Sequence, residues 1–167
     1  SGSYDDYGHE LHYAKYDGKT YITFCCEFGV KSPTGTTYQY GTDFKKYLNR
    51  SGATYENIAD YIAFGYTLVY GDGLPSTTAE KKAACATQQY VWEKLGVNPT
   101  RSSWNSTYMS DSIYKDWKEK TEARISEYYD NQVSFNGSSK TVNLGGSTTI
   151  TDSNGALKDF PTFTKTI

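Results

Sequence analysis

The feature that most constrains the fold is a helix-like stretch over residues 77–96 whose apolar face includes a glutamine. The residues that recur at the spacing of one helical face are Ala84, Gln88, Val91, Trp92 and Leu95. Thr77 and Glu80 have the spacing of a capping box, and Gly96 suits the left-handed position that follows a helix. The pattern therefore predicts a helix over residues 77–95 with Gln88 turned toward a core.

Upstream of this helix, two adjacent cysteines lie in a segment with strand character. The Asp17-Gly18 pair is a turn signal and predicts a β-hairpin over residues 11–28. Alternation along the second strand gives two faces, Ile22, Phe24 and Cys26 on one and Tyr21, Thr23 and Cys25 on the other. The first face is apolar, so Cys26 is interpreted as a small core residue, and Cys85 as a packing residue of the later helix. Cys25 remains on the more polar face.

The rest of the chain combines helical and strand-like patterns. Helices are expected from Tyr55 to about Phe64 and from about Asp111 to Tyr129. After residue 132 the period changes to two, with strand candidates over 133–135, 140–144, 148–151 and 156–160. We therefore predict an α+β fold, a β-sandwich or barrel with an inserted α-helical subdomain. The expected organisation is a single domain over residues 1–167, with sandwich parts at about 8–43 and 132–167 and the helical insertion at about 44–131.

The composition excludes several classes of function. The chain of 167 residues can bury a core, and its net charge of −2 provides no basic footprint for nucleic acid. No apolar run is long enough to span a membrane. An odd count of three cysteines does not suit a disulfide framework, and His9 and His12 lack the spacing of a metal site. No phosphate loop, dinucleotide fingerprint or nucleophile elbow is present, so we expect neither metal nor cofactor.

A buried primary amide beside a thiol has one unusual chemical option. The Cys25 thiolate can attack the side-chain carbonyl of Gln88 and expel ammonia, which leaves an internal thioester. Two plainer interpretations compete with this reaction. Gln88 can satisfy its amide with hydrogen bonds to nearby backbone. A covalent link can also be purely structural, and by analogy with a disulfide it would restrict the unfolded chain by about 4 kcal/mol.

Two short motifs in this order have a family resemblance. Phe24-Cys25-Cys26 has the form aromatic-Cys-apolar, except that a second cysteine takes the apolar position. Residues 87–92 read Thr-Gln-Gln-Tyr-Val-Trp, and segments 31–35 and 64–66 lie between the motifs. Together, over most of the chain, they resemble the thioester domains found at the tips of Gram-positive surface adhesins. The motif register and the strand faces both select Cys25, and not Cys26, as the reactive cysteine.

The resemblance implies a site and a role. A Cys25–Gln88 thioester would form without cofactor, with aromatic shielding from Trp92, Tyr21 and Tyr66, for which plain core packing is the alternative. Backbone N–H groups or a tyrosine hydroxyl would stabilise the oxyanion. The implied protein is extracellular and anchored to the cell wall by parts outside this chain. It would acylate an amine, expected to be a lysine, on a host surface or matrix protein. Nothing regenerates the thioester, so it is a single-turnover reagent and not an enzyme.

A non-covalent adhesin is the alternative function. The chain has 17 tyrosines, and exposed tyrosines together with Trp104 would provide an aromatic platform for a glycan or peptide. In that case the Cys–Gln crosslink is structural or absent. The tyrosines are equally suited to strand and core positions, so composition does not separate the two functions.

Overall fold

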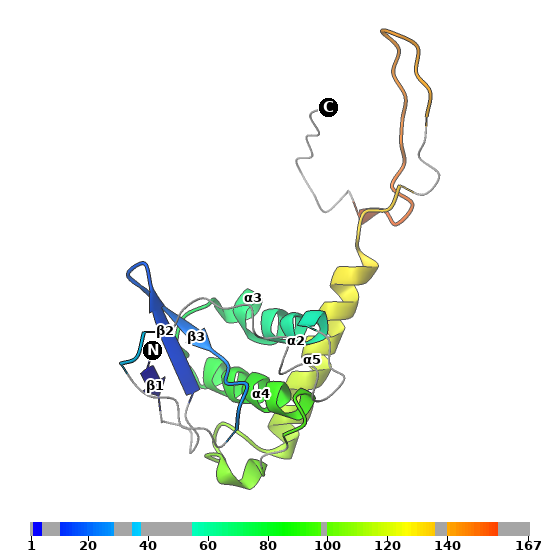
Figure 1. Ribbon diagram of the computed structural model, residues 1–167. Coiled ribbons are helices and arrows are strands. Elements are labelled where there is room, and N and C mark those ends of the chain that lie inside the picture. Colours follow the sequence, from blue (N-terminus) through cyan, green and yellow to red (C-terminus); the bar gives the residue numbers. More distant parts are fainter. Residues whose placement is uncertain are drawn as a thin grey trace. The chain divides into compact units, whose positions relative to one another are not determined.

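The computed structural model describes residues 2–4, 11–28, 35–37, 55–97, 100–135 and 140–156. The chain divides into two compact units, Ser1–Ala123 and Arg124–Ile167. The described parts combine an antiparallel sheet with helices, so the protein is a mixed α/β protein (Figure 1). None of the helices in the described ranges has the length and apolar character needed to cross a bilayer. The single domain over residues 1–167 stays a prediction.

The sheet of the first unit has three antiparallel strands in the order β1-β2-β3, with bounds Gly2–Tyr4, Leu11–Tyr16 and Lys19–Thr23. The β2–β3 pair is the predicted hairpin, and its register runs from His12 opposite Thr23 to Tyr16 opposite Lys19. Both turn residues have positive φ, 47° at Asp17 and 74° at Gly18, as a tight two-residue turn requires. The hairpin prediction is confirmed, but β3 ends at Thr23, so Cys25 lies just beyond the strand.

Helices make up most of the remainder. Helix α2 (Tyr55–Ile62) continues into a π-helical turn η1 (Ala63–Thr67) and the short α3 (Leu68–Tyr70). Helix α4 (Thr78–Lys94) begins with the predicted capping box of Thr77 and Glu80 and is followed by Gly96 at φ 78°. A 3-10 turn η2 (Arg101–Ser103) precedes α5 (Asp111–Asp130). All three predicted helices are therefore present.

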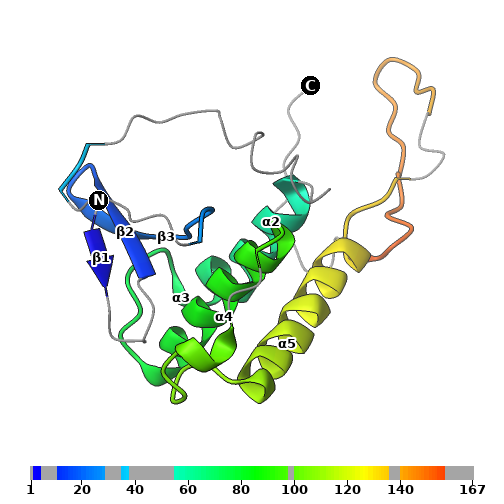
Figure 2. The same ribbon diagram turned by 60° about the horizontal axis from the view of Figure 1, so that its bottom comes forward.

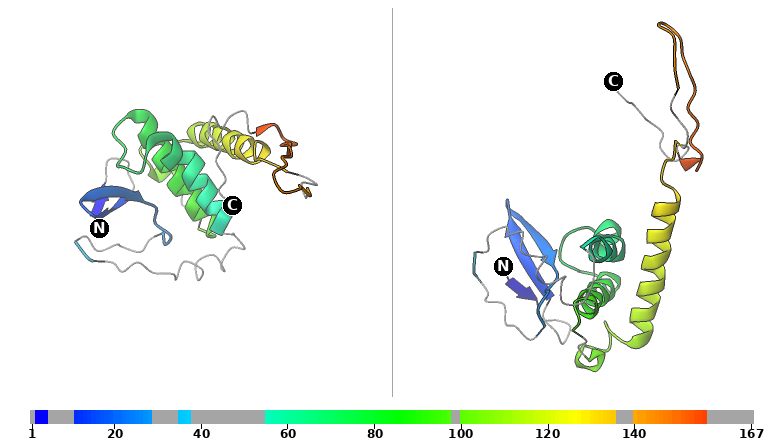
Figure 3. Two further views of the ribbon diagram at one scale, coloured as in Figure 1. Left: turned by 90° about the horizontal axis from the view of Figure 1, so that it is seen from above. Right: turned by 45° about the vertical axis from the view of Figure 1, so that its right-hand side comes forward.

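Helix α4 is the centre of the first unit. Ten consecutive residues, from Ala83 to Trp92, are buried, so the middle of α4 is covered on all sides and not only on the predicted stripe. Figures 2 and 3 show why: α2 and α4 run side by side, with the sheet on one flank and the start of α5 on the other. A helix in this position can present one residue to the hairpin and its neighbour to α5.

A close approach between η1 and α5 holds this arrangement together. The indole N–H of Trp117 donates to the carbonyl of Gly65 at 3.0 Å. A Cβ atom at Gly65 would lie 2.5 Å from the Trp117 ring. Tyr61 and Tyr90 stack beside this contact, with ring centroids 3.9 Å apart. A glycine in the π-helical turn is therefore a packing requirement, because any side chain would displace the indole.

The second unit differs from the predicted pattern of strands. The described residues 131–135 and 140–156 form turns and irregular backbone, and none of them belongs to a strand. Every side chain from residue 140 to 151 is exposed, so the alternating residues have no surface to pack against, and alternation alone does not make a strand. Ser134 and Ser153 join the two segments, with the Ser153 N–H 2.7 Å from the Ser134 carbonyl. Residues 157–160 of the last strand candidate lie outside the described residues.

Candidate functional site

The predicted pair, Cys25 and Gln88, is in direct contact. Gln88 lies on α4, has 0% of its surface exposed, and faces the end of the hairpin. Its Oε1 accepts the main-chain N–H of Cys25 at 2.7 Å, and its Nε2 donates to the main-chain carbonyl of Cys25 at 2.8 Å. The N–H and the carbonyl of Cys25 thus determine which end of the Gln88 amide is oxygen and which is nitrogen. Both main-chain polar groups of Cys25, just beyond the end of β3, therefore bind a side chain of α4.

Aromatic contacts on both sides of Cys25 hold its segment against the helices. Phe24 packs edge-on against Tyr66, with ring centroids 6.1 Å apart. Phe28 packs edge-on against Trp92, with ring centroids 5.0 Å apart. The hairpin itself is attached further upstream, where the N–H of Ile22 donates to the carbonyl of Asp72 at 2.8 Å. Cys25 therefore lies between two anchored aromatic residues, opposite Gln88.

The Cys25 thiol is free and half-buried. Its Sγ is 3.2 Å from the main-chain carbonyl of Glu27, a contact in which the thiol donates. That contact is a weak one for sulfur, so the side chain can leave it by a rotation about χ1. Cys25 therefore carries the thiol on its side chain and binds the Gln88 amide through its main chain.

The other two thiols have environments that disfavour the thiolate. Cys26 packs against the core cluster of Ile58, Val91 and Leu95. Burial raises the pKa of the Cys26 thiol to about 11, and the adjacent Cys25 and Glu27 add to the rise. Burial likewise raises the pKa of the fully buried Cys85 thiol. These positions fit the prediction that both residues serve packing.

The residues predicted to shield the bond lie at different depths. Trp92 and Tyr66 are buried and contact the aromatic residues on either side of Cys25. The Tyr66 hydroxyl donates to the Gly73 carbonyl at 3.1 Å, and burial raises its pKa. Tyr21 is only half-buried and lies on β3, three residues before Phe24 in the chain. The sequence did not predict that Phe24 and Phe28 are the aromatic neighbours of Cys25. Their positions on either side of the cysteine pair in the chain were the one signal that could have indicated it.

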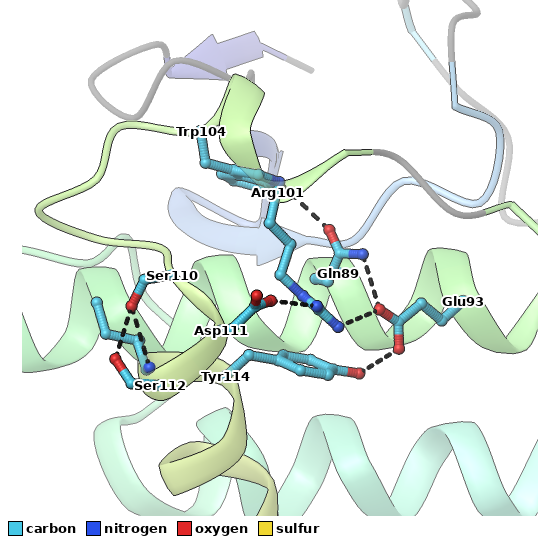
Figure 4. Close-up of polar contacts among 9 residues, drawn as sticks. Gln89, Glu93, Arg101, Trp104, Ser110, Asp111, Ser112 and Tyr114 are labelled. Atoms are coloured by element: carbon cyan, nitrogen blue, oxygen red, sulfur yellow. Dashed lines mark hydrogen bonds and ion pairs between the residues drawn. The ribbon is translucent and has the colours of Figure 1, made fainter.

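A polar cluster beside Gln88 was also missed (Figure 4). Its centre is Glu93 on α4, whose carboxylate accepts hydrogen bonds from the Tyr114 hydroxyl at 2.6 Å and from Arg101 at 2.8 Å. The Gln89 amide donates to the same carboxylate at 2.9 Å. The Arg101 guanidinium lies over the Tyr114 ring, 4.3 Å from its centroid. These contacts tie α4 to η2 and to the first turn of α5.

Two further contacts extend the cluster. Arg101 also bonds Asp111 at 2.6 Å, which connects η2 to the start of α5. The Trp104 indole N–H donates to Gln89 Oε1 at 3.3 Å, and Trp104 packs on Trp92. Gln89 thus faces Trp104, next to η2, while Gln88 faces the hairpin. The i, i+4 spacing of Gln89 and Glu93 was the only local sign of the cluster.

The burial of Trp104 corrects one expectation. Trp104 is 4% exposed and its indole N–H is bonded within the protein, so it provides no exposed face of an aromatic platform. Its size and its apolar ring favour the core once Gln89 offers a buried acceptor. Tyr16, Tyr128 and Tyr129 are exposed, and the last two belong to the second unit. Trp104 is therefore not part of an exposed aromatic platform, and the prediction is wrong for this residue.

Comparisons with protein families, curated proteins and solved structures find no match for the chain. Over the described residues, no group of three or more His, Cys, Asp and Glu side chains is arranged to hold a metal ion. The chemistry of the site must therefore be argued from Cys25, Gln88 and their neighbours.

Proposed function

We propose that the chain is a thioester domain of a Gram-positive surface adhesin, in which Cys25 and Gln88 join through a thioester. The support is the fully buried Gln88 amide, held against the main chain of Cys25 by hydrogen bonds of 2.7 and 2.8 Å. The two residues are 63 positions apart in the chain, so local structure does not bring them together. A thiol that belongs to the residue holding the amide has little distance to cover.

The bond forms by substitution at the amide carbon. The Cys25 side chain rotates away from the Glu27 carbonyl, and its thiolate adds to Cδ of Gln88. The tetrahedral intermediate expels the amide nitrogen, which leaves as ammonia with the proton that the thiol gave up. The products are a thioester and one ammonia, and neither metal nor redox partner takes part.

The thioester then acts once on a host surface. An amine, most simply that of a lysine on a host surface or matrix protein, attacks the acyl carbon of residue 88 and displaces the Cys25 thiolate. The product is an amide between the adhesin and its target, with a free thiol at Cys25. The reaction is selective for an amine held near the bond, since positioning raises its effective concentration far above that of free amines. No group restores the thioester, so the domain is a reagent and not an enzyme.

The proposal includes the parent protein and the finer fold. The domain would be extracellular and attached to the cell wall by segments outside this chain. Its strands would belong to a β-sandwich or barrel with an inserted helical subdomain. The support for the first part of that layout is the element order, in which the antiparallel sheet comes before α2 and α4.

A second candidate is favoured by the same two hydrogen bonds. They satisfy both ends of the Gln88 amide, as a purely structural glutamine would require. In that case the protein is a non-covalent adhesin or a glycan- or peptide-binding module, and Cys25 is an ordinary thiol. Of the two candidate functions, only the thioester domain also explains why the residue that binds the Gln88 amide is a cysteine without a disulfide partner.

Capture of host proteins distinguishes the candidates. Wild type and Cys25→Ala are mixed with host surface and matrix proteins and then boiled in denaturant. The thioester domain gives an adduct that survives boiling, requires Cys25 and maps to residue 88. Methylamine should compete with the adduct and add to the same residue. Equal and fully reversible binding by both proteins would support the non-covalent module instead.

A further inference from the structure

We infer that the main-chain N–H of Cys25 is the oxyanion donor of the site, so that one residue supplies both the nucleophile and the stabilising hydrogen bond. This inference rests on the proposed thioester function and deepens it. The carrying observation is the 2.7 Å contact between this N–H and Oε1 of Gln88. Oε1 is the atom on which negative charge develops when any nucleophile adds to the amide carbon.

The second hydrogen bond makes the first one specific. The Gln88 Nε2 group donates to the Cys25 carbonyl at 2.8 Å, so the amide cannot exchange its oxygen and nitrogen by turning over. Oε1 of Gln88 therefore faces the N–H of Cys25, and Nε2, the atom that leaves as ammonia, faces the Cys25 carbonyl. The amide plane is set by main-chain atoms, which do not need to reorganise when charge develops.

Burial strengthens the contact. Gln88 has no exposed surface, and Phe24 and Phe28 flank the donor residue against Tyr66 and Trp92. A hydrogen bond to a developing charge is stronger where water is excluded. The other predicted donor type, a tyrosine hydroxyl, is otherwise engaged at Tyr66, since this hydroxyl donates to the Gly73 carbonyl.

A nucleophile that carries its own oxyanion donor has a precedent in chemistry. In the serine-protease mechanism, the main-chain N–H of the nucleophilic serine belongs to the oxyanion hole. The same relation at Cys25 would serve both halves of the reaction. When the thiolate adds to Cδ, the C–O π electrons move to Oε1 and ammonia then leaves. When an amine adds to the thioester, the charge returns to the same oxygen, the thiolate leaves, and the amine proton goes to the thiol.

The test removes this N–H and keeps the thiol. Cys85 provides a ligation junction, so that synthetic residues 1–84 can be joined to expressed residues 85–167 to give the full chain. In one variant the α-hydroxy analogue of cysteine replaces Cys25, which changes a single N–H into an ester oxygen. In the matched control, phenyllactic acid replaces Phe24, which makes the same change one residue earlier and leaves both Cys25 contacts intact. The unmodified ligated chain is the reference.

Refolding starts the reaction, and the loss of one ammonia is followed by intact mass. The ester at residue 25 should slow thioester formation by about 100-fold or more, as loss of one oxyanion donor does elsewhere. The ester at residue 24 should change the rate by only a few-fold. Equal rates for the two ester variants would overturn the inference while leaving the thioester intact. No ammonia loss in the unmodified chain would instead refute the proposed function.

A second measurement covers the case in which the ester at residue 25 prevents folding. Hydrogen exchange at the Cys25 N–H is compared between wild type and Gln88→Met, which keeps the side-chain length and removes the carbonyl oxygen. The N–H should be protected in wild type, with the thioester formed, and should exchange at least tenfold faster in Gln88→Met. Equal protection in both proteins would show that the N–H does not bond this oxygen, and the inference would fall.

Discussion

Phe28 lies edge-on against Trp92, with ring centroids 5.0 Å apart and ring planes at 74°. Trp92 is one helical turn beyond Gln88, and Phe28 is three residues beyond Cys25, so this pair closes one side of the Cys25–Gln88 contact. Phe28 is 40% exposed, which makes it a cover of the site more than a member of the core. Its removal should therefore affect the lifetime of the bond before it affects folding.

Phe28→Ala should shorten the lifetime of the thioester in water. An aromatic pair contributes about 0.5–1.5 kcal/mol, so its loss should raise the population of an opened site, and with it hydrolysis, by about 2- to 10-fold. The measurement is the slow gain of one water in intact mass at neutral pH. Phe28→Tyr keeps the ring and is the control. Equal lifetimes for Phe28→Ala and wild type would show that this ring does not shield the bond.

Glu93→Gln should destabilise the fold. The carboxylate accepts hydrogen bonds from Gln89, Arg101 and Tyr114, and the half-exposed ion pair with Arg101 is screened in part by solvent. The loss of charge-assisted hydrogen bonds should lower the free energy of unfolding by about 1–3 kcal/mol in a denaturant titration. Asp116→Asn breaks the exposed pair with Lys120 and should cost less than about 1 kcal/mol. Equal effects of the two variants would contradict a structural role for the cluster.

Gly65→Ala should disturb the packing of η1 on α5. The new methyl group would start 2.5 Å from the Trp117 ring, and overpacking of this kind costs about 1–3 kcal/mol. Gly73→Ala is the control, because a Cβ at Gly73 meets no atom within 4 Å. Thermal unfolding of both variants measures the difference. A Gly65→Ala protein as stable as Gly73→Ala would mean that the indole moves aside without cost.

The start of α4 should respond to acid. The main-chain N–H of Ser76, then that of Thr77 and the Ser76 hydroxyl, lower the pKa of Glu80 from 4.5 to about 2. Because the folded pKa is the lower one, this stabilisation is fully present above pH 4.5 and is lost as the pH falls toward 2. Stability of wild type should therefore decline more steeply across this window than that of Glu80→Gln. Parallel declines would show that the capping carboxylate is not the responsive group.

The features that could be predicted from the sequence are those with local signals. The Asp17-Gly18 turn gave the hairpin, and Thr77 with Glu80 gave the start of α4, since each depends on residues a few positions apart. The helical period predicted that Gln88 faces a core, and the resemblance of the two motifs predicted Cys25 of the hairpin segment as its partner. The binding of the Gln88 amide by the main chain of Cys25 could not be predicted from local signals, because the two residues are 63 positions apart.

Polar contacts between residues far apart in the chain could not be predicted from the sequence for a similar reason. The cluster around Glu93 joins residues from α4, η2 and α5, and only its Gln89 member has a helical spacing to Glu93. The alternation of apolar and polar residues after residue 132 led to a wrong prediction. It predicted strands, whereas the described residues 140–151 are exposed and irregular. A period of two specifies a strand only where one face has a surface to pack on.

Intact mass of freshly purified protein tests the central claim most directly. The account predicts that wild type is lighter than its calculated mass by one ammonia. Cys25→Ala should restore the calculated mass, and Cys26→Ala should keep the deficit, because Cys25 binds the Gln88 amide and Cys26 packs against the core. A deficit that depends on Cys26 and not on Cys25 would reverse the assignment. A wild-type protein at its full calculated mass would contradict the thioester altogether.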